Sequence, residues 1–202
     1  MTGTITKRAE QAIKTKLNIL EVAFKLIEAE GYDNVTVEHI CSALNLSRGA
    51  FYHYFKSKSD IIIYRYKLAE GDYLNHYNNH LSLPADKQLR AMFDWYNNYF
   101  SKDRLMETKI VLKIELENQH ANFASNNTFQ VNVITNILKH GIIEGIFPTD
   151  LDVKKVSKFI FTNIYGIIYQ WCVSNGNFDF KENFDSFYEN FLKAILDCSK
   201  NK

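Results

Sequence analysis

A break in the helical pattern at Asn45 constrains the fold of this chain more than any other feature of its sequence. Before the break, apolar residues recur at the spacing of one face of a short α-helix, namely Val37, Ile40, Cys41 and Leu44. Asparagine enters the left-handed backbone region at lower cost than most residues, as a tight turn between helices requires. We therefore expect two short helices, joined by a tight turn, in the arrangement of a helix-turn-helix.

Capping residues mark the ends of these helices. Thr36 precedes the first and Ser47 the second, and both residue types accept hydrogen bonds from the free amides of a first helical turn. Ser57, with Asp60 three residues later, has the pattern of a capping box and predicts a longer helix over about residues 58–80. An earlier amphipathic helix is predicted by an apolar stripe made of Ile13, Leu17, Leu20, Phe24 and Ile27.

The second short helix has two faces of different chemistry. Helical geometry turns four residues inward against the preceding helices: Ala50, Phe51, Tyr54 and Phe55. Four others face outward: Arg48, Gly49, Tyr52 and His53. A face with a small residue and with guanidinium, hydroxyl and imidazole groups suits a helix that enters the major groove of DNA. The alternative is an ordinary solvated surface.

Charge is distributed unevenly along the N-terminal part of the chain. The formal net charge of the 202 residues is +1, but it is +3 over residues 1–20, −4 over residues 21–38 and +3 over residues 39–59. Two basic segments separated by an acidic one predict, after folding, a basic face that favours a polyanionic partner. Such a charge run also fits a solvated surface.

The remaining sequence also indicates helices. The content of 8 Gly and 2 Pro favours long helices, and no alternating pattern of useful length indicates a strand. Three cysteines cannot all pair with one another and lack metal-ligand spacing, which indicates reduced thiols in a cytoplasmic protein. No signal peptide is recognisable, and the apolar run over residues 159–173 is too short to span a membrane. We expect an all-α protein without a membrane partner.

The segment LNLSRGAFYHYFKSKSD, residues 44–60, resembles the recognition-helix segment of the tetracycline-repressor (TetR) family of bacterial transcription regulators. The resemblance is strong over about residues 10–66 and only architectural beyond. It implies a helix-turn-helix DNA-binding domain at residues 1–58 and a larger helical effector-binding and dimerisation domain at residues 59–202. Asn45 stands where the family usually has glycine. Ala50 stands where threonine is frequent, which leaves an apolar contact to a thymine methyl.

The resemblance also implies which residues touch DNA. They are Thr36, Val37, Ser47, Arg48, Gly49, Ala50, Tyr52, His53, Lys56 and Lys58. Within this set, Thr36, Tyr52 and Lys58 are expected on phosphates. Arg48 is expected to read a base, because its planar fork suits the O6/N7 edge of guanine. Glu38 lies among these positions and would repel phosphate, so it either accepts a hydrogen bond from cytosine N4 or points away.

In the larger domain, the resemblance implies an effector cavity and a dimer interface. Aromatic residues that could line the cavity are Trp95, Tyr96, Tyr99, Phe100, Phe123, Phe161, Tyr165 and Tyr169. The helices Val153–Ser174 and Phe184–Leu196 are expected to form a homodimer interface, and Gly166 would permit a close approach. The alternatives are that the aromatic residues only fill the core and that both helices pack only within one chain.

These expectations favour a cytoplasmic, homodimeric repressor that binds a palindromic operator and is released by a small lipophilic or aromatic effector. The alternative function is an all-α enzyme or small-molecule carrier with an incidental helix-turn-helix. No catalytic constellation or phosphate loop is found, so neither an enzyme nor a cofactor is expected. His76 and His80 have spacing compatible with a metal, but we expect them to be solvated histidines and predict no metal site.

Overall fold

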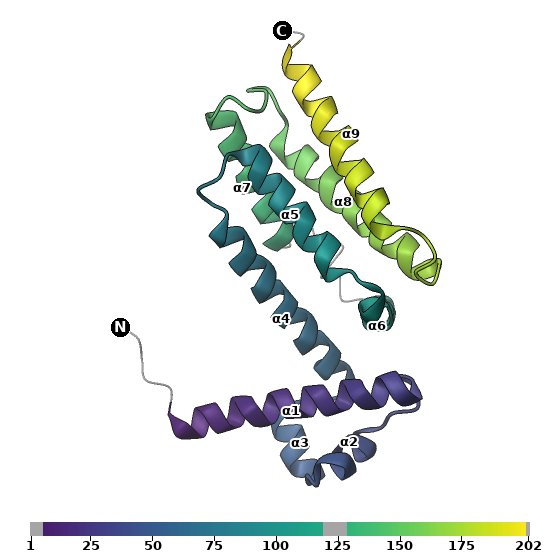
Figure 1. Cartoon of the computed structure of the whole chain (residues 1–202). Helices are drawn as coiled ribbons and strands as arrows, with labels where there is room; N and C mark the ends of the chain where they lie inside the picture. The colour runs from purple at the N-terminus through teal and green to yellow at the C-terminus, as the bar shows by residue number, and fades with distance from the viewer. Residues whose placement is uncertain (1–5, 119–128, 201–202) are drawn as a thin grey trace. The chain divides into compact units, whose positions relative to one another are not determined.

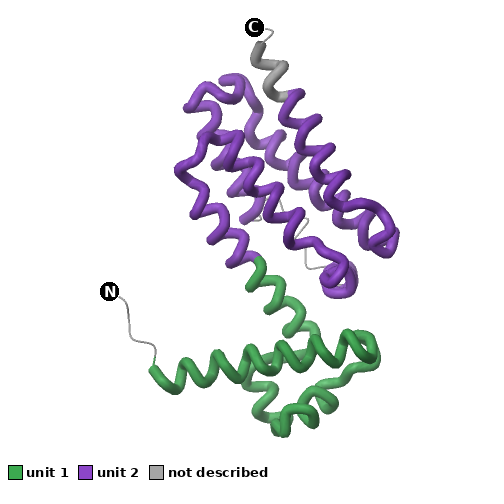
Figure 2. Tube along the Cα trace, viewed as in Figure 1, with its two compact units in different colours: residues 1–69 green, residues 70–202 purple. Residues whose placement is uncertain are grey.

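The structure is a computed structural model that describes residues 6–118 and 129–200, without the side chains of residues 195–200. Every regular element within these residues is helical, which confirms the predicted all-α class. The chain divides into two compact units, residues 1–69 and 70–202 (Figure 2). This division falls inside a helix, α4 (Lys58–Asn79), which begins in the first unit and ends in the second.

The first unit holds three further helices (Figure 1). They are α1 (Lys7–Glu30), α2 (Val37–Leu44) and α3 (Arg48–Tyr54). Helix α1 contacts α2, and α2 contacts α3. Gly31 ends α1 with φ 85°, a conformation that favours glycine over residues with a side chain.

The predicted caps are confirmed. The hydroxyl of Thr36 accepts from the amide of His39 at 3.2 Å, and that of Ser47 accepts from the amide of Ala50 at 3.1 Å. At the start of α4, the hydroxyl of Ser57 accepts from the amide of Asp60 at 3.1 Å. In return, the Asp60 carboxylate accepts from the amide of Lys56 at 2.8 Å. This arrangement resembles a capping box, although the carboxylate accepts from the amide one residue before the cap, and it satisfies two backbone donors.

The turn between α2 and α3 also agrees with the prediction. Asn45 has φ 51° and ψ 38°, in the left-handed region. The amide of the next residue, Leu46, donates to the carbonyl of Cys41 at 2.9 Å. This bond satisfies a carbonyl at the end of α2 and turns the chain into α3 within three residues.

The core of the first unit is apolar. Its buried residues are Ile19, Leu20, Ala23, Phe24 and Ile27 of α1, Val35 before α2, Ile40 and Cys41 of α2, Phe51 and Phe55 at α3, and Ile61, Ile62 and Ala69 of α4. The predicted stripe of α1 is correct only in part. Ile13 and Leu17 are 50% and 41% exposed, because the first turns of α1 are not covered within this unit.

The second unit is a bundle around the helices α5 (Ala85–Tyr99), α7 (Phe129–Ile143), α8 (Val153–Val173) and α9 (Phe180–Lys200). A short 3-10 helix (Lys102–Arg104) leads into α6 (Leu105–Asn118). Helix α7 packs on α5 and α8, and α9 packs on the same two helices (Figure 1). Among the polar contacts between α5 and α9 is an ion pair in which Arg90 Nη2 lies 2.7 Å from Asp185 Oδ1.

Within one chain, helix α8 is buried along a single stripe. Its buried residues are Ser157, Ile160, Phe161, Ile164, Ile168, Trp171 and Cys172. Among the residues that the structure describes, none of the helices combines the length and the apolar composition needed to cross a bilayer.

Candidate DNA-binding interface

The outward face of α3 is open to solvent. Arg48, Gly49, Tyr52 and His53 are exposed, whereas Phe51 is fully buried and Phe55, directly after the helix, is 4% exposed. The ring of Phe51 lies 5.5 Å from that of Tyr52 and 6.2 Å from that of Phe55. The inward aromatic residues therefore fix the helix, and the outward ones remain available to a partner, as the sequence predicted.

Arg48, at the start of α3, is held by two neighbours. A hydrogen bond with Tyr52, one turn further along α3, and the nearby carboxylate of Glu38 both raise the pKa of the guanidinium. Its Nη1 atom lies 3.1 Å from Oε1 of Glu38, in the first turn of α2. Glu38 accepts a hydrogen bond from its own amide, and this bond and the charge of Arg48 lower the pKa of its carboxyl. The pair therefore stays fully charged at neutral pH.

Thr36 and Ser47 are exposed, and each caps a helix. A hydroxyl has two acceptor lone pairs and one proton, so a capping oxygen can still donate to a phosphate. Val37 and Ala50 are half-buried beside them, and Lys56 is exposed. The structure thus places these five residues on or next to the accessible part of the motif.

Lys58, at the start of α4, is engaged by the loop between α1 and α2. Its ammonium donates to the carbonyl of Tyr32 and, at 2.7 Å, to that of Val35, and it lies 4.1 Å from the centre of the Tyr32 ring. An ammonium has three N–H donors, so at most one is left for a phosphate. Lys58 holds the loop between α1 and α2, and its loss would disturb the fold as well as any contact with DNA.

A basic groove of about 380 Å³ runs along the end of α3 and the start of α4. Its lining residues are Lys16, Tyr52, His53, Tyr54, Phe55, Lys56, Asp60, Ile63, Tyr64 and Lys67. Lys16 is anchored from α1, because its Nζ atom lies 3.9 Å from the centre of the Tyr64 ring. The one carboxylate in the lining, Asp60, is engaged by the amide of Lys56. Sequence reasoning missed Lys16 and Lys67 as members of this surface, because they come from two other helices.

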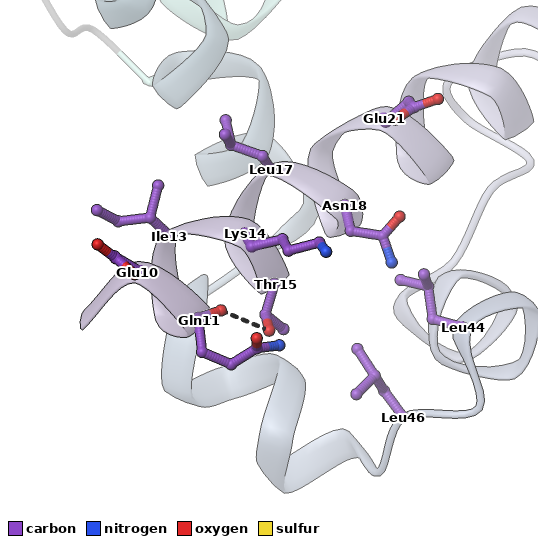
Figure 3. Close-up of a pocket in the computed structure, with 10 residues that line it drawn as sticks. All are labelled: Glu10, Gln11, Ile13, Lys14, Thr15, Leu17, Asn18, Glu21, Leu44 and Leu46. Carbon is purple, nitrogen blue, oxygen red and sulfur yellow. Dashed lines mark hydrogen bonds between the residues drawn. The ribbon is translucent and has the colours of Figure 1, made fainter. Parts of the chain in front are cut away.

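A second hollow of the first unit, of about 730 Å³, has the opposite character (Figure 3). It lies along the N-terminal half of α1 and is closed by Leu44 and Leu46 of the turn region. Its charged residues are Glu10, Lys14 and Glu21, so acids outnumber bases. The exposed Ile13 and Leu17 give it an apolar floor. The chemistry of this hollow does not suit a phosphate, in contrast to the basic groove.

Comparison with known proteins agrees with this geometry. Residues 19–64 match the sequence model of bacterial regulatory proteins of the tetR family, and residues 80–194 match that of the YsiA-like protein C-terminal region. The chain belongs to the TetR family. It is therefore a helix-turn-helix transcription regulator by family, with an N-terminal helix-turn-helix domain and a larger C-terminal helical domain.

Two curated relatives extend over most of the chain. The fatty acid metabolism regulator protein of Bacillus subtilis is 22% identical over 183 residues, which are 89% of this chain and 94% of the relative. The HTH-type transcriptional regulator AcrR of Shigella flexneri is 25% identical over 203 residues, 95% of this chain and 94% of the relative.

Three solved structures share the fold. The fatty acid degradation regulator FadR of Bacillus halodurans has a TM-score of 0.70 at 20% identity and covers 88% of this chain and 94% of its own. Thermus thermophilus FadR in complex with lauroyl-CoA has a TM-score of 0.65 at 19% identity, covering 90% and 95%. Bacillus subtilis FadR in complex with stearoyl-CoA has a TM-score of 0.64 at 20% identity, covering 89% and 97%.

In the second unit of this TetR-family chain, the expected effector residues of α5 lie in one aromatic cluster. Trp95 stacks on Tyr99 at 4.8 Å, and Tyr96 stacks on Phe100 at 6.0 Å. Sequence reasoning missed the residue that joins them, Tyr73 of α4. Its ring lies 5.0 Å from Trp95 and 5.6 Å from Tyr96. The helical stripe of α4 was too irregular to mark this position as buried.

The hydroxyl of Tyr73 has no hydrogen-bond partner among the described residues, although the side chain is 2% exposed. Burial raises the pKa of Tyr73 far above its ordinary value, so the hydroxyl keeps its proton. A buried donor without a partner costs roughly 1–3 kcal/mol. Tyr73 therefore presents an unused donor inside the aromatic cluster.

The expected effector residues of α8 have different positions. Phe161 and Tyr165 lie near each other at 6.3 Å, and the Tyr165 hydroxyl donates to Glu115 of α6 at 3.1 Å. Burial raises the pKa of Glu115 to about 7. Tyr169 is 53% exposed, so it does not line the interior of one chain. It was wrongly expected there because the buried stripe of α8 passes through positions 161, 164, 168 and 172 instead. Phe123 lies outside the described residues.

The side of α8 that carries Tyr169 is apolar and open. Phe159, Tyr169 and Val173 are 55%, 53% and 68% exposed. A Cβ atom on Gly166, between them in the sequence, would meet nothing within 4 Å. The ring of Phe159 lies 6.2 Å from that of Phe191 of α9. These residues form an apolar face on α8 and α9, which we call the α8–α9 face.

His76 and His80 were expected to be solvated, and this expectation is wrong. Both are half-buried, with ring centres 4.3 Å apart. His76 Nε2 bonds to the carbonyl of Ala91 at 3.0 Å, and His80 Nδ1 bonds to the carbonyl of His76 at 2.7 Å. They link α4 to α5 in the second unit. Over the described part of the chain, no group of three or more potential metal-binding side chains occurs.

Proposed function

We propose that this protein is a cytoplasmic, homodimeric transcriptional repressor that binds a palindromic operator and has no enzymatic activity. The observation that carries the proposal is the accessible face of α3, where Arg48, Tyr52 and His53 are exposed above a helix fixed by buried Phe51. Each protomer would place α3 in a major groove, so that two half-sites are read about 34–36 Å apart or at a multiple of that distance. Residues 1–58 would form the DNA-binding domain and residues 59–202 the effector-binding and dimerisation domain.

The DNA contacts that we propose are those expected from the sequence. Arg48 would read a base, and Ala50 would leave an apolar contact to a thymine methyl. The other residues would contact the backbone or approach it closely, namely Thr36, Val37, Ser47, Gly49, Tyr52, His53 and Lys56. Lys58 would act chiefly by holding the loop between α1 and α2.

The α8–α9 face supports the proposed dimer. Three large apolar side chains exposed within a few turns of one helix exceed the scattered exposure that is ordinary on a monomer. A twofold axis through this face would bring each α8 against its copy, with Gly166 allowing a close approach.

The aromatic cluster supports an effector in the second unit. The two FadR proteins of Thermus thermophilus and Bacillus subtilis are in complex with lauroyl-CoA and stearoyl-CoA, respectively. We propose a lipophilic effector of the same class here, with Tyr73 donating to an oxygen of the ligand. Because α4 contributes to both units, an effector that binds only the DNA-incompatible state would release the operator through this helix.

This proposal is tested by titrating lauroyl-CoA and stearoyl-CoA into the complex of the protein with a labelled duplex from upstream of its own gene. Fluorescence anisotropy should show DNA release by at least one of them. For Tyr73→Phe, the concentration needed for half release should rise about tenfold, because one hydrogen bond is lost. Stability should not fall, since the variant removes an unpaired buried hydroxyl.

Tyr77→Phe is the matched control, because the hydroxyl of Tyr77 already bonds to Asn136. It should leave the effector response unchanged. A Tyr73→Phe protein that responds as the wild type does would exclude Tyr73 from the effector site. A wild-type protein that stays bound to DNA in the presence of lauroyl-CoA and of stearoyl-CoA would contradict the proposed effector class.

The basic groove gives a second prediction. If DNA phosphates occupy it, Lys67→Gln should flatten the slope of log Kobs against log salt by about 1.8, which is about 0.9 for each of two protomers. Affinity for operator and scrambled duplexes should fall alike. Lys25→Gln is the control, because Lys25 is equally cationic but pairs with Glu21 on the surface of α1. Equal slopes for the two variants would mean that the groove lies outside the DNA footprint.

A further inference from the structure

Glu38 faces the same solvent as the residues proposed to touch DNA. Its side chain is 54% exposed, and the sequence has no other acid until Asp60. DNA carries a dense row of negative phosphates, so a carboxylate here opposes binding unless it has a specific task. The structure shows what this carboxylate does: it lies 3.1 Å from the guanidinium of Arg48.

The ion pair contributes little to folding. Exposed pairs of this kind stabilise proteins only weakly, because water screens the charges and the side chains lose freedom. The main consequence of the ion pair is therefore for the Arg48 side chain on the proposed DNA-binding surface, and not for stability. Glu38 from α2 and Tyr52 from α3 approach Arg48 from two helices, which restricts a side chain that would otherwise move freely.

The guanidinium can keep both neighbours and still read a base. It has five N–H donors, of which one serves Glu38 and one serves Tyr52. Three are left, and a bidentate contact with guanine O6 and N7 needs two. On a duplex without guanine at this position, Arg48 gains no such contact. The repulsion between the Glu38 carboxylate and the phosphates is then not compensated by a base contact.

We propose that Glu38 is a specificity-determining residue of the DNA interface, which positions Arg48 for a guanine edge and opposes sequence-independent binding. This inference rests on the proposed function. It assigns Glu38 no direct contact with a base, so its effect on base preference acts through Arg48.

The test compares the wild type with Glu38→Gln on the operator duplex and on a scrambled duplex of the same length, over a range of salt concentrations. Glutamine keeps the shape and the acceptor oxygen but removes the charge. Affinity for the scrambled duplex should rise roughly tenfold, because two carboxylates are neutralised per dimer. Operator affinity should change by less than about threefold. The ratio of operator affinity to scrambled-duplex affinity should therefore fall.

Two controls distinguish the positioning of Arg48 by Glu38 from the effect of the protein's net charge. Glu28→Gln makes the same change of net charge at an exposed site near the end of α1 and should leave the ratio unchanged. In an Arg48→Ala background, Glu38→Gln should no longer alter the ratio, because the residue it positions is gone.

Three outcomes would overturn the inference. Glu38→Gln could raise both affinities equally, which would indicate charge alone. It could lose affinity only at one C·G pair, which would make Glu38 a direct reader of cytosine N4. It could also change the ratio to the same extent without Arg48. A wild-type protein that does not prefer any operator would instead refute the proposed function, so the two failures are distinguishable.

Discussion

Replacing Phe51 with alanine should lower the free energy of unfolding of the first unit by about 4 kcal/mol and abolish operator binding. The ring is fully buried, and it packs beside Tyr52 and Phe55. Its removal leaves a cavity under α3, so the helix loses its fixed position as well as buried apolar area. Urea unfolding followed by circular dichroism measures the first effect, and fluorescence anisotropy with operator DNA measures the second.

The adjacent residue provides the control. Tyr52→Phe removes one exposed hydroxyl and keeps the ring, so stability should change by less than about 0.5 kcal/mol. Operator binding should still weaken, because the proposed phosphate contact and the hydrogen bond to Arg48 are lost. An unchanged urea midpoint for Phe51→Ala, or unchanged DNA affinity for Tyr52→Phe, would refute the division of α3 into a structural and a contacting face.

Replacing Arg48 with alanine should reduce operator affinity about 100-fold or more. A bidentate contact with guanine contributes about 1–3 kcal/mol of discrimination, and the proposed dimer would have two of them. Affinity for scrambled DNA should fall only about tenfold, because that loss is electrostatic. Parallel titrations of operator variants, with each guanine replaced in turn, should show that the variant no longer distinguishes one guanine per half-site.

Arg48→Lys separates charge from geometry. Lysine keeps the positive charge but lacks the planar fork, so it should restore most of the affinity for scrambled DNA and little of the base preference. An equal loss on operator and scrambled duplexes for Arg48→Ala would remove this residue from the reading role.

Local features of this fold were predictable from the sequence because their causes are local. Asn45 adopts the left-handed turn, and Thr36, Ser47 and Ser57 cap helices within three residues of themselves. The same holds for the two faces of α3, since helical geometry alone separates buried Phe51 from exposed Arg48. These features depend on only a few neighbouring residues.

Features that join distant parts of the chain were not predictable in this way. Lys58 bonds to carbonyls 23 and 26 residues earlier, which gives it a structural role that its sequence neighbours do not indicate. Tyr73 is buried by residues of α5 and α7, and no periodicity in α4 marks it. Tyr169 was misplaced because an apolar helix offers several possible buried stripes, and only its neighbours select one.

Methylation interference at guanine N7 on operator DNA tests the central claim most directly, because this atom lies in the major groove that α3 is proposed to enter. The account predicts two groups of interfering guanines, one per half-site, about 34–36 Å apart along the duplex or at a multiple of that distance. They should vanish for Arg48→Ala. A single group, or bound DNA without any interference in the major groove, would contradict a dimer that reads DNA through α3.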